Sequence, residues 1–116
     1  MAYEGSCHCG AVTFTVQGDI PGEAISCNCS HCRRKGFLLT FVPAGQFILE
    51  SGEEALTAYT FNTHKLQHRF CKTCGVQGFA EGKGPDGADT RAINLRAVAD
   101  CDLDSLTIQK VDGASY

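Results

Sequence analysis

The chain has 116 residues, of which 43% are hydrophobic and 20% are charged, and its formal net charge is −3 at pH 7. This length predicts a single domain over residues 1–116, with a modest core. The negative charge and the lack of a long basic run argue against nucleic acid as a partner. No apolar run reaches the ~18–20 residues that a membrane span needs. The first ten residues, MAYEGSCHCG, do not resemble a signal peptide, so we expect a cytoplasmic protein with reduced thiols.

Short β-strands are predicted along most of the chain. In residues 11–18, Val12, Phe14 and Val16 alternate with polar residues, which is typical of a half-buried strand. Further strands are predicted at 37–42, 46–52, 56–62, 64–70, 76–80, 90–98 and 107–111, a loop at 82–89 and a short helical turn at 102–106. Because 13 glycines accompany these strands and no sustained helical period is present, the sequence predicts a mainly β domain.

Seven of the eight cysteines fall into three local groups. These are Cys7 and Cys9 in CHCG, Cys27, Cys29 and Cys32 in CNCSHC, and Cys71 and Cys74 in CKTCG, with Cys101 standing apart. In a reducing compartment, clustered cysteines more often bind metal than form disulfides, and a disulfide framework is the weaker alternative.

A count of ligands predicts two zinc sites per chain. Zinc takes four ligands in a tetrahedron, and Cys7, Cys9, Cys71 and Cys74 make one complete set. Such a site would tie the first strand to a later hairpin and stabilise a small domain. The triplet Cys27, Cys29 and Cys32 then has one open position, which is typical of a catalytic zinc.

Two alternatives for the triplet remain open. Cys101 or a nearby histidine would complete it as a second closed site, or the triplet would carry no metal. The basic run Arg33, Arg34 and Lys35 follows the triplet directly. These cations would offset the negative charge of a zinc with three thiolates, bind the carboxylates of an anionic thiol, or form a solvated turn.

The segments GSCHCGAVTF, CNCSHCRRKG and RFCKTCGVQGF, in this order and spacing, resemble the glutathione-dependent formaldehyde-activating enzyme (GFA) family. The resemblance extends from Gly5 to about Val98. It implies a small tent of antiparallel β-sheets with few short helical turns. It also implies a structural zinc at Cys7, Cys9, Cys71 and Cys74, and a second, labile zinc at Cys27, Cys29 and Cys32.

The resemblance further implies an enzyme, a carbon–sulfur lyase that combines formaldehyde with glutathione to give S-hydroxymethylglutathione. We therefore predict a zinc-dependent lyase acting on a small glutathione-like thiol and a small aldehyde. Cys27, Cys29 and Cys32 would form its catalytic centre, where an open zinc binds and deprotonates the thiol. The alternatives are a non-catalytic zinc-stapled binding module and a thiol-responsive zinc carrier or sensor. We expect a monomer or a weak homodimer.

Other polar and aromatic residues carry weaker signals. His31 lies inside the triplet, either as a proton shuttle, as a hydrogen-bond donor near the metal, or as a surface residue in a turn. His68 is predicted to be buried and hydrogen-bonded, and Phe37 to pack in the core. Cys101 is expected to be a small buried hydrophobic residue unless it is the fourth ligand.

Overall fold

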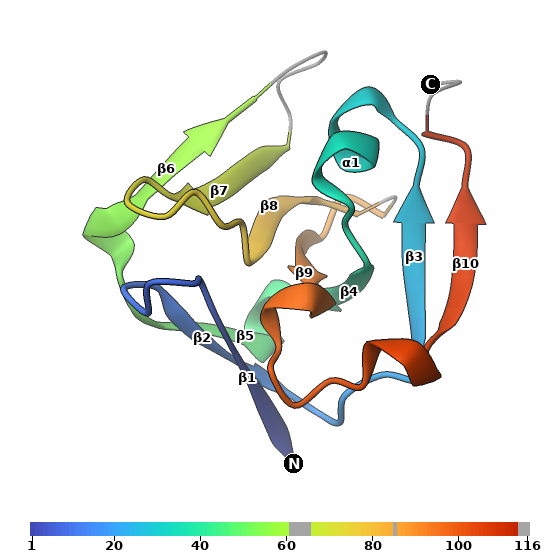
Figure 1. The fold of residues 1–116 in the computed structure, drawn as a ribbon, viewed down its shortest axis with the longest axis horizontal. Coiled ribbons are helices and arrows are strands. Elements are labelled where there is room, and N and C mark those ends of the chain that lie inside the picture. Colours follow the sequence, from blue (N-terminus) through green and yellow to red (C-terminus); the bar gives the residue numbers. More distant parts are fainter. Residues whose placement is uncertain (61–65, 85, 114–116) are drawn as a thin grey trace.

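Two β-sheets make up most of the protein in the computed structural model, which describes residues 1–60, 66–84 and 86–113 (Figure 1). The three-stranded sheet has the order β1–β2–β5, with strands at Ala2–Ser6, Thr13–Gln17 and Phe47–Ser51. The seven-stranded sheet has the order β10–β3–β4–β9–β8–β7–β6. Its strands are β3 (Glu23–Cys27), β4 (Leu39–Pro43), β6 (Leu56–Tyr59), β7 (Gln67–Cys71), β8 (Phe79–Lys83), β9 (Asp89–Asn94) and β10 (Thr107–Val111).

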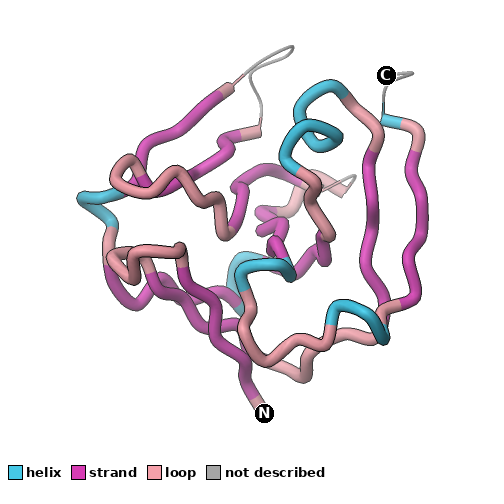
Figure 2. Tube along the Cα trace, viewed as in Figure 1, coloured by secondary structure: helices cyan, strands magenta, loops and turns pink. Residues whose placement is uncertain are grey.

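Helices are few and short, as Figure 2 shows. Within the described ranges there is one α-helix, α1 at Ser30–Lys35, which joins β3 to β4. Four 3-10 turns accompany it: η1 (Ala44–Gln46), η2 (Glu53–Ala55), η3 (Leu95–Ala97) and η4 (Leu103–Ser105). The predicted mainly β fold with antiparallel sheets and short helical turns is therefore confirmed.

The hydrophobic core lies where the two sheets face each other. Phe14 of β2 is almost fully buried; its ring stacks on Phe47 of β5 at 5.3 Å between centroids and meets Phe79 of β8 edge-on at 5.9 Å. A Cβ atom added to Gly5 or to Gly78 would lie 2.1 Å or 2.7 Å from carbons of the Phe14 ring. The central ring therefore fits only because both neighbouring positions are glycine.

One strand pair departs from the antiparallel pattern. β10 pairs with β3 in parallel, from Thr107 opposite Glu23 to Val111 opposite Cys27. A parallel partner requires a long crossover connection, and here the chain between β3 and β10 contains most of the rest of the sheet. The pairing places the carboxyl end of β10 beside the triplet of cysteines.

Several predicted strand boundaries were wrong. The strand predicted at 37–42 begins at Leu39, and the one predicted at 76–80 begins at Phe79 and continues to Lys83, inside the predicted loop 82–89. The strand predicted at 90–98 ends at Asn94, because the Asn94 side chain accepts a hydrogen bond from the Arg96 N–H and starts η3. The last residues of the strand predicted at 56–62 and the first of that at 64–70, including His64, lie outside the described residues.

Candidate metal centres

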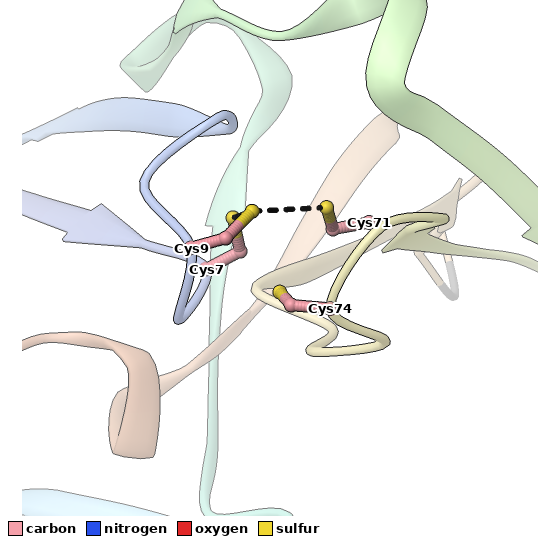
Figure 3. Close-up of side chains that lie close together, drawn as sticks. All are labelled: Cys7, Cys9, Cys71 and Cys74. Atoms are coloured by element: carbon pink, nitrogen blue, oxygen red, sulfur yellow. Dashed lines mark hydrogen bonds between the residues drawn. The ribbon is translucent and has the colours of Figure 1, made fainter.

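The first group of cysteines joins two tight turns from different sheets (Figure 3). Cys7 and Cys9 follow β1, whereas Cys71 is the last residue of β7 and Cys74 lies in the turn before β8. The four sulfur atoms lie within 4.8 Å of one another. The Sγ–Sγ distance is 3.6 Å between Cys7 and Cys9, and 3.7 Å between Cys9 and Cys71.

These distances match a tetrahedral metal centre. A metal–sulfur bond of ~2.3 Å gives tetrahedral edges of about 3.8 Å between sulfurs. A disulfide would need ~2.05 Å, and all eight cysteines are free. The four thiols therefore fit a closed, four-coordinate ion, and the side chains of Cys7 and Cys71 are buried in the core as expected of a structural site.

The two turns have the same backbone design. The Cys7 N–H donates to the Val12 carbonyl at 3.0 Å, and the Cys71 N–H donates to the Val76 carbonyl at 3.1 Å. Each turn reverses at a glycine with positive φ, 83° at Gly10 and 81° at Gly75, a conformation that favours glycine.

Backbone N–H groups in these turns favour the thiolate form that a metal requires. The Val12 N–H donates to Cys7 Sγ at 3.3 Å. The backbone N–H groups of Cys9 and Val76 lower the pKa of Cys74 to about 6. A cysteine that is ionised near neutral pH binds metal without competition from a proton.

The second group surrounds the start of α1. Cys27 is the last residue of β3, Cys29 is the N-cap of the helix, and Cys32 lies in its first turn. Their sulfur atoms lie within 4.8 Å of one another, and all three residues are half-buried. In the part of the chain that the structure describes, no fourth Cys, His, Asp or Glu joins them. The geometry thus offers three ligands, with the fourth position of a tetrahedral ion left open.

Hydrogen bonds within the triplet orient its sulfurs. The Cys32 N–H donates to Cys29 Sγ at 3.3 Å, and the Cys29 N–H donates to Cys27 Sγ at 3.5 Å. Burial acts to raise the pKa of Cys29, but hydrogen bonds from the N–H groups of Cys32 and His31 outweigh it and the pKa is lowered. Burial raises the pKa of Cys32. Cys29 is therefore the thiol that ionises more readily of these two.

Cys101 does not complete the triplet. It is buried in the main hydrophobic cluster, together with Tyr3 and Val98. Burial raises the pKa of its thiol, and the nearby charge of Asp102 adds to the effect. Its predicted role as a small hydrophobic core residue is the one that the structure supports.

The carboxyl end of β10 packs against one side of the triplet. The Asn28 N–H donates to the Val111 carbonyl at 3.1 Å, and the Asn28 side chain donates to Asp112 Oδ1 at 3.0 Å. A Cβ atom on Gly113 would lie only 2.4 Å from Cys27 Sγ. Gly113 was not predicted as a site residue, because nothing in the sequence near it indicates contact with a segment more than 80 positions earlier.

His31 and His68 meet behind α1. Their ring centroids are 4.0 Å apart, and the His31 ring also stacks on Tyr59 at 5.6 Å and contacts Phe37 at 5.7 Å. The expectation of a surface His31 in a turn is therefore wrong, because the helix directs this side chain inward. The prediction of a buried, hydrogen-bonded His68 is confirmed, and Phe37 is buried as predicted.

Gln77 connects His68 to the basic end of α1. Lys35 Nζ lies 3.4 Å from Gln77 Oε1, and Gln77 Nε2 lies 3.1 Å from His68 Nδ1. Because an ammonium group can only donate, the Gln77 oxygen faces Lys35 and its NH₂ group donates to His68. His68 is therefore neutral, with its proton on Nε2. Sequence reasoning missed Gln77, since a lone glutamine within the strand predicted at 76–80 carries no spacing signal.

No helix in the described residues is long and apolar enough to cross a membrane.

The fold and the sites define a mainly β protein with one four-cysteine group and one three-cysteine group. A family profile described as glutathione-dependent formaldehyde-activating enzyme, GFA, matches residues 2–106. The chain therefore belongs to the GFA family, as its cysteine motifs predicted.

Two relatives show how far the likeness extends. A protein of Halomonas elongata, provisionally named glutathione-dependent formaldehyde-activating enzyme, is 32% identical over 82 residues, which cover 64% of this chain and 52% of the relative. The chain thus spans about half the length of that curated relative. A crystal structure of a Rhodobacter sphaeroides protein has a TM-score of 0.80 at 28% identity, covering 93% of this chain and 99% of the other.

Proposed function

We propose that this chain is a zinc-dependent carbon–sulfur lyase that reversibly joins a small thiol, glutathione first among the candidates, to formaldehyde or a similar small aldehyde. The observation that carries the proposal is the group of three half-buried sulfurs at Cys27, Cys29 and Cys32, which no fourth metal-binding side chain joins among the described residues. Membership of the GFA family supports the choice of substrates.

The two groups of cysteines have different proposed roles. Zinc at Cys7, Cys9, Cys71 and Cys74 is structural, because four protein ligands leave no position for substrate. Zinc at Cys27, Cys29 and Cys32 is labile and catalytic, because substrate can take its fourth position. We propose residues 1–116 as one GFA-like domain acting in the cytoplasm, where its thiols stay reduced.

The proposed reaction needs no oxidant or reductant. The sulfur–carbon bond forms as the carbonyl π bond opens, the thiol gives up its proton, and the carbonyl oxygen takes one up. Bound zinc supplies positive charge that favours the thiolate form of the substrate. The chain itself holds the triplet in position through the N–H groups of Cys29 and Cys32, which donate to the neighbouring ligand sulfurs.

Zinc content before and after glutathione treatment tests the open position. We expect about two zinc ions per chain after purification without chelator, and about one after dialysis against millimolar glutathione. Elemental analysis measures both. If both ions stay in place, the triplet has found a fourth ligand and the enzyme proposal fails.

Adduct formation tests the activity directly. Exchange NMR with isotope-labelled formaldehyde measures how fast S-hydroxymethylglutathione forms above the uncatalysed rate. We expect Cys32→Ala to abolish the acceleration and Cys101→Ala, which removes a cysteine outside both groups, to retain it. A Cys32→Ala protein as active as the parent would contradict the proposal. Glutathione-dependent zinc release without any acceleration would instead identify a zinc carrier or sensor.

A further inference from the structure

An open cavity of about 590 Å³ lies between α1 and the strands β6 and β7, outside the two groups of cysteines. Its lining comes from one face of α1 and from two aromatic side chains of the strands: Ser30, His31, Arg34, Lys35, Tyr59 and Phe70. Figure 1 shows α1, β6 and β7 at the same end of the molecule. The chain thus holds a concave surface beside the helix that carries Cys32.

The cavity contains positive charge without a counter-ion. Lys35 Nζ lies 5.1 Å from the centroid of the Phe70 ring and 6.0 Å from that of Phe37, and its hydrogen-bond acceptor is the neutral oxygen of Gln77. The Arg34 guanidinium donates to the Ser30 carbonyl at 2.8 Å. Of the ion pairs found among the described residues, none involves Arg34 or Lys35.

The rest of the lining is neutral or aromatic. No Asp or Glu lines the cavity among the described residues. Burial lowers the pKa of Lys35, because it disfavours the charged ammonium form. An anion placed beside the ammonium group would therefore stabilise that form. The Tyr59 and Phe70 rings offer apolar walls. This combination fits an organic anion with a carboxylate at one end and carbon groups beyond it.

The cavity and the triplet are formed in part by the same segment of the chain, from Cys29 to Lys35. Ser30 and His31, which line it, lie between Cys29 and Cys32 in sequence. Lys35 is three residues beyond Cys32, about 4.5 Å along the helix axis. Residues 30, 31, 34 and 35 share one face of α1 and Cys32 lies on another, so a molecule that binds in the cavity and reaches the metal ligands would extend around the short helix.

We propose that this cavity binds the carboxylate-bearing body of the thiol substrate, with Lys35 and Arg34 at the carboxylate and the Tyr59 and Phe70 rings against the carbon chain. The identity of the ligand as the thiol substrate rests on the function proposed above. The cavity then sets specificity, because anionic peptide thiols gain a contact that neutral thiols such as 2-mercaptoethanol do not.

Binding of S-methylglutathione to the zinc-loaded protein tests this proposal by calorimetry. This probe keeps both carboxylates of glutathione but has no free thiol to bind zinc. Lys35→Met removes the charge and keeps an apolar side chain of similar length. We expect it to weaken binding about tenfold, as for the loss of one charge-assisted hydrogen bond. Arg33→Met removes a charge from the same helix without altering the cavity lining, and we expect a change of less than about twofold.

The outcomes separate this inference from the proposed function. Loss of affinity in Lys35→Met but not in Arg33→Met supports the cavity site, even if no formaldehyde adduct forms. Equal affinity of Lys35→Met and the parent, no binding of S-methylglutathione, or equal weakening in both variants overturns it, even if the enzyme is active. In an active enzyme we further expect Lys35→Met to raise KM for glutathione and to leave KM for 2-mercaptoethanol unchanged.

Discussion

At the scale of single residues, neighbouring side chains set the protonation of His68. The Gln77 side chain takes a hydrogen bond from Lys35 and donates one to His68 Nδ1. Burial lowers the pKa of His68 to about 4, and the electrostatic interactions of His68 with His31 and Lys35 act in the same direction. The folded protein therefore holds this imidazole neutral near pH 7.

This lowered pKa predicts that stability falls in mild acid. The unfolded chain takes up a proton at His68 near its ordinary pKa of 6.5, whereas the folded chain does so only near 4. The contribution that the neutral His68 side chain makes to stability is complete above pH 6.5. It is lost as the pH falls toward 4. We expect the free energy of unfolding to fall by about 1–2 kcal/mol between pH 7 and pH 5. Urea unfolding at each pH measures it.

His68→Asn is the matched control, since it keeps an amide near the position of Nδ1 but cannot titrate. We expect this variant to be less stable at pH 7 and to lose less stability on going to pH 5. Zinc content measured at each pH separates the titration from loss of metal. Identical pH slopes for the variant and the parent would show that His68 does not carry the effect.

At the scale of elements, the triplet depends on strands and a helix that are distant in sequence. β3 brings in Cys27, and α1 brings in Cys29 and Cys32. The end of β10 closes one side, where the hydrogen of Gly113 replaces a side chain. This last contact exists because β10 pairs in parallel with β3.

Gly113→Ala is therefore expected to weaken metal binding at the triplet. Its methyl group would displace the Cys27 sulfur, which lies 2.4 Å from the position of the added atom. We expect the dissociation constant of the second zinc to rise by about tenfold or more, while the four-cysteine site is unchanged. Competition with a chromophoric chelator resolves the two sites.

The control for this variant is Gly45→Ala, where nothing lies within 4 Å of the added carbon. It should leave both zinc affinities as they are in the parent. If Gly113→Ala releases its second zinc no more readily than Gly45→Ala, the end of β10 does not support the triplet.

At the scale of the whole molecule, the four-cysteine group joins the two sheets. Cys7 and Cys9 follow a strand of the three-stranded sheet, and Cys71 and Cys74 belong to the seven-stranded sheet. The triplet, in contrast, lies within one sheet and its helix. Loss of metal at the two sites should therefore affect stability very differently.

Substituting one cysteine in each group tests this difference. We expect Cys71→Ser to lower the free energy of unfolding by about 5 kcal/mol or more, because the zinc proposed to join the sheets would be lost. Cys32→Ser should cost about 1 kcal/mol while removing only the second zinc. Thermal unfolding together with zinc analysis measures both. Equal destabilisation by the two substitutions would contradict a division into structural and catalytic centres.

The sequence by itself determined which cysteines form the two candidate metal sites. The spacing of the cysteines predicted both metal groups, because ligands one or two residues apart can reach one ion. The alternation in 11–18 predicted β2, since strand periodicity is a local property. α1 was missed because six residues are too few for a helical period and its N-cap is a cysteine.

Only the tertiary structure decided which distant residues surround these ligands. It placed Cys101 in the core, turned His31 against His68, and brought Gly113 to Cys27 and Lys35 to Phe70. Such contacts arise from strand order and packing between segments far apart in the chain. They leave no periodic mark on the local sequence, because each depends on the fold as a whole.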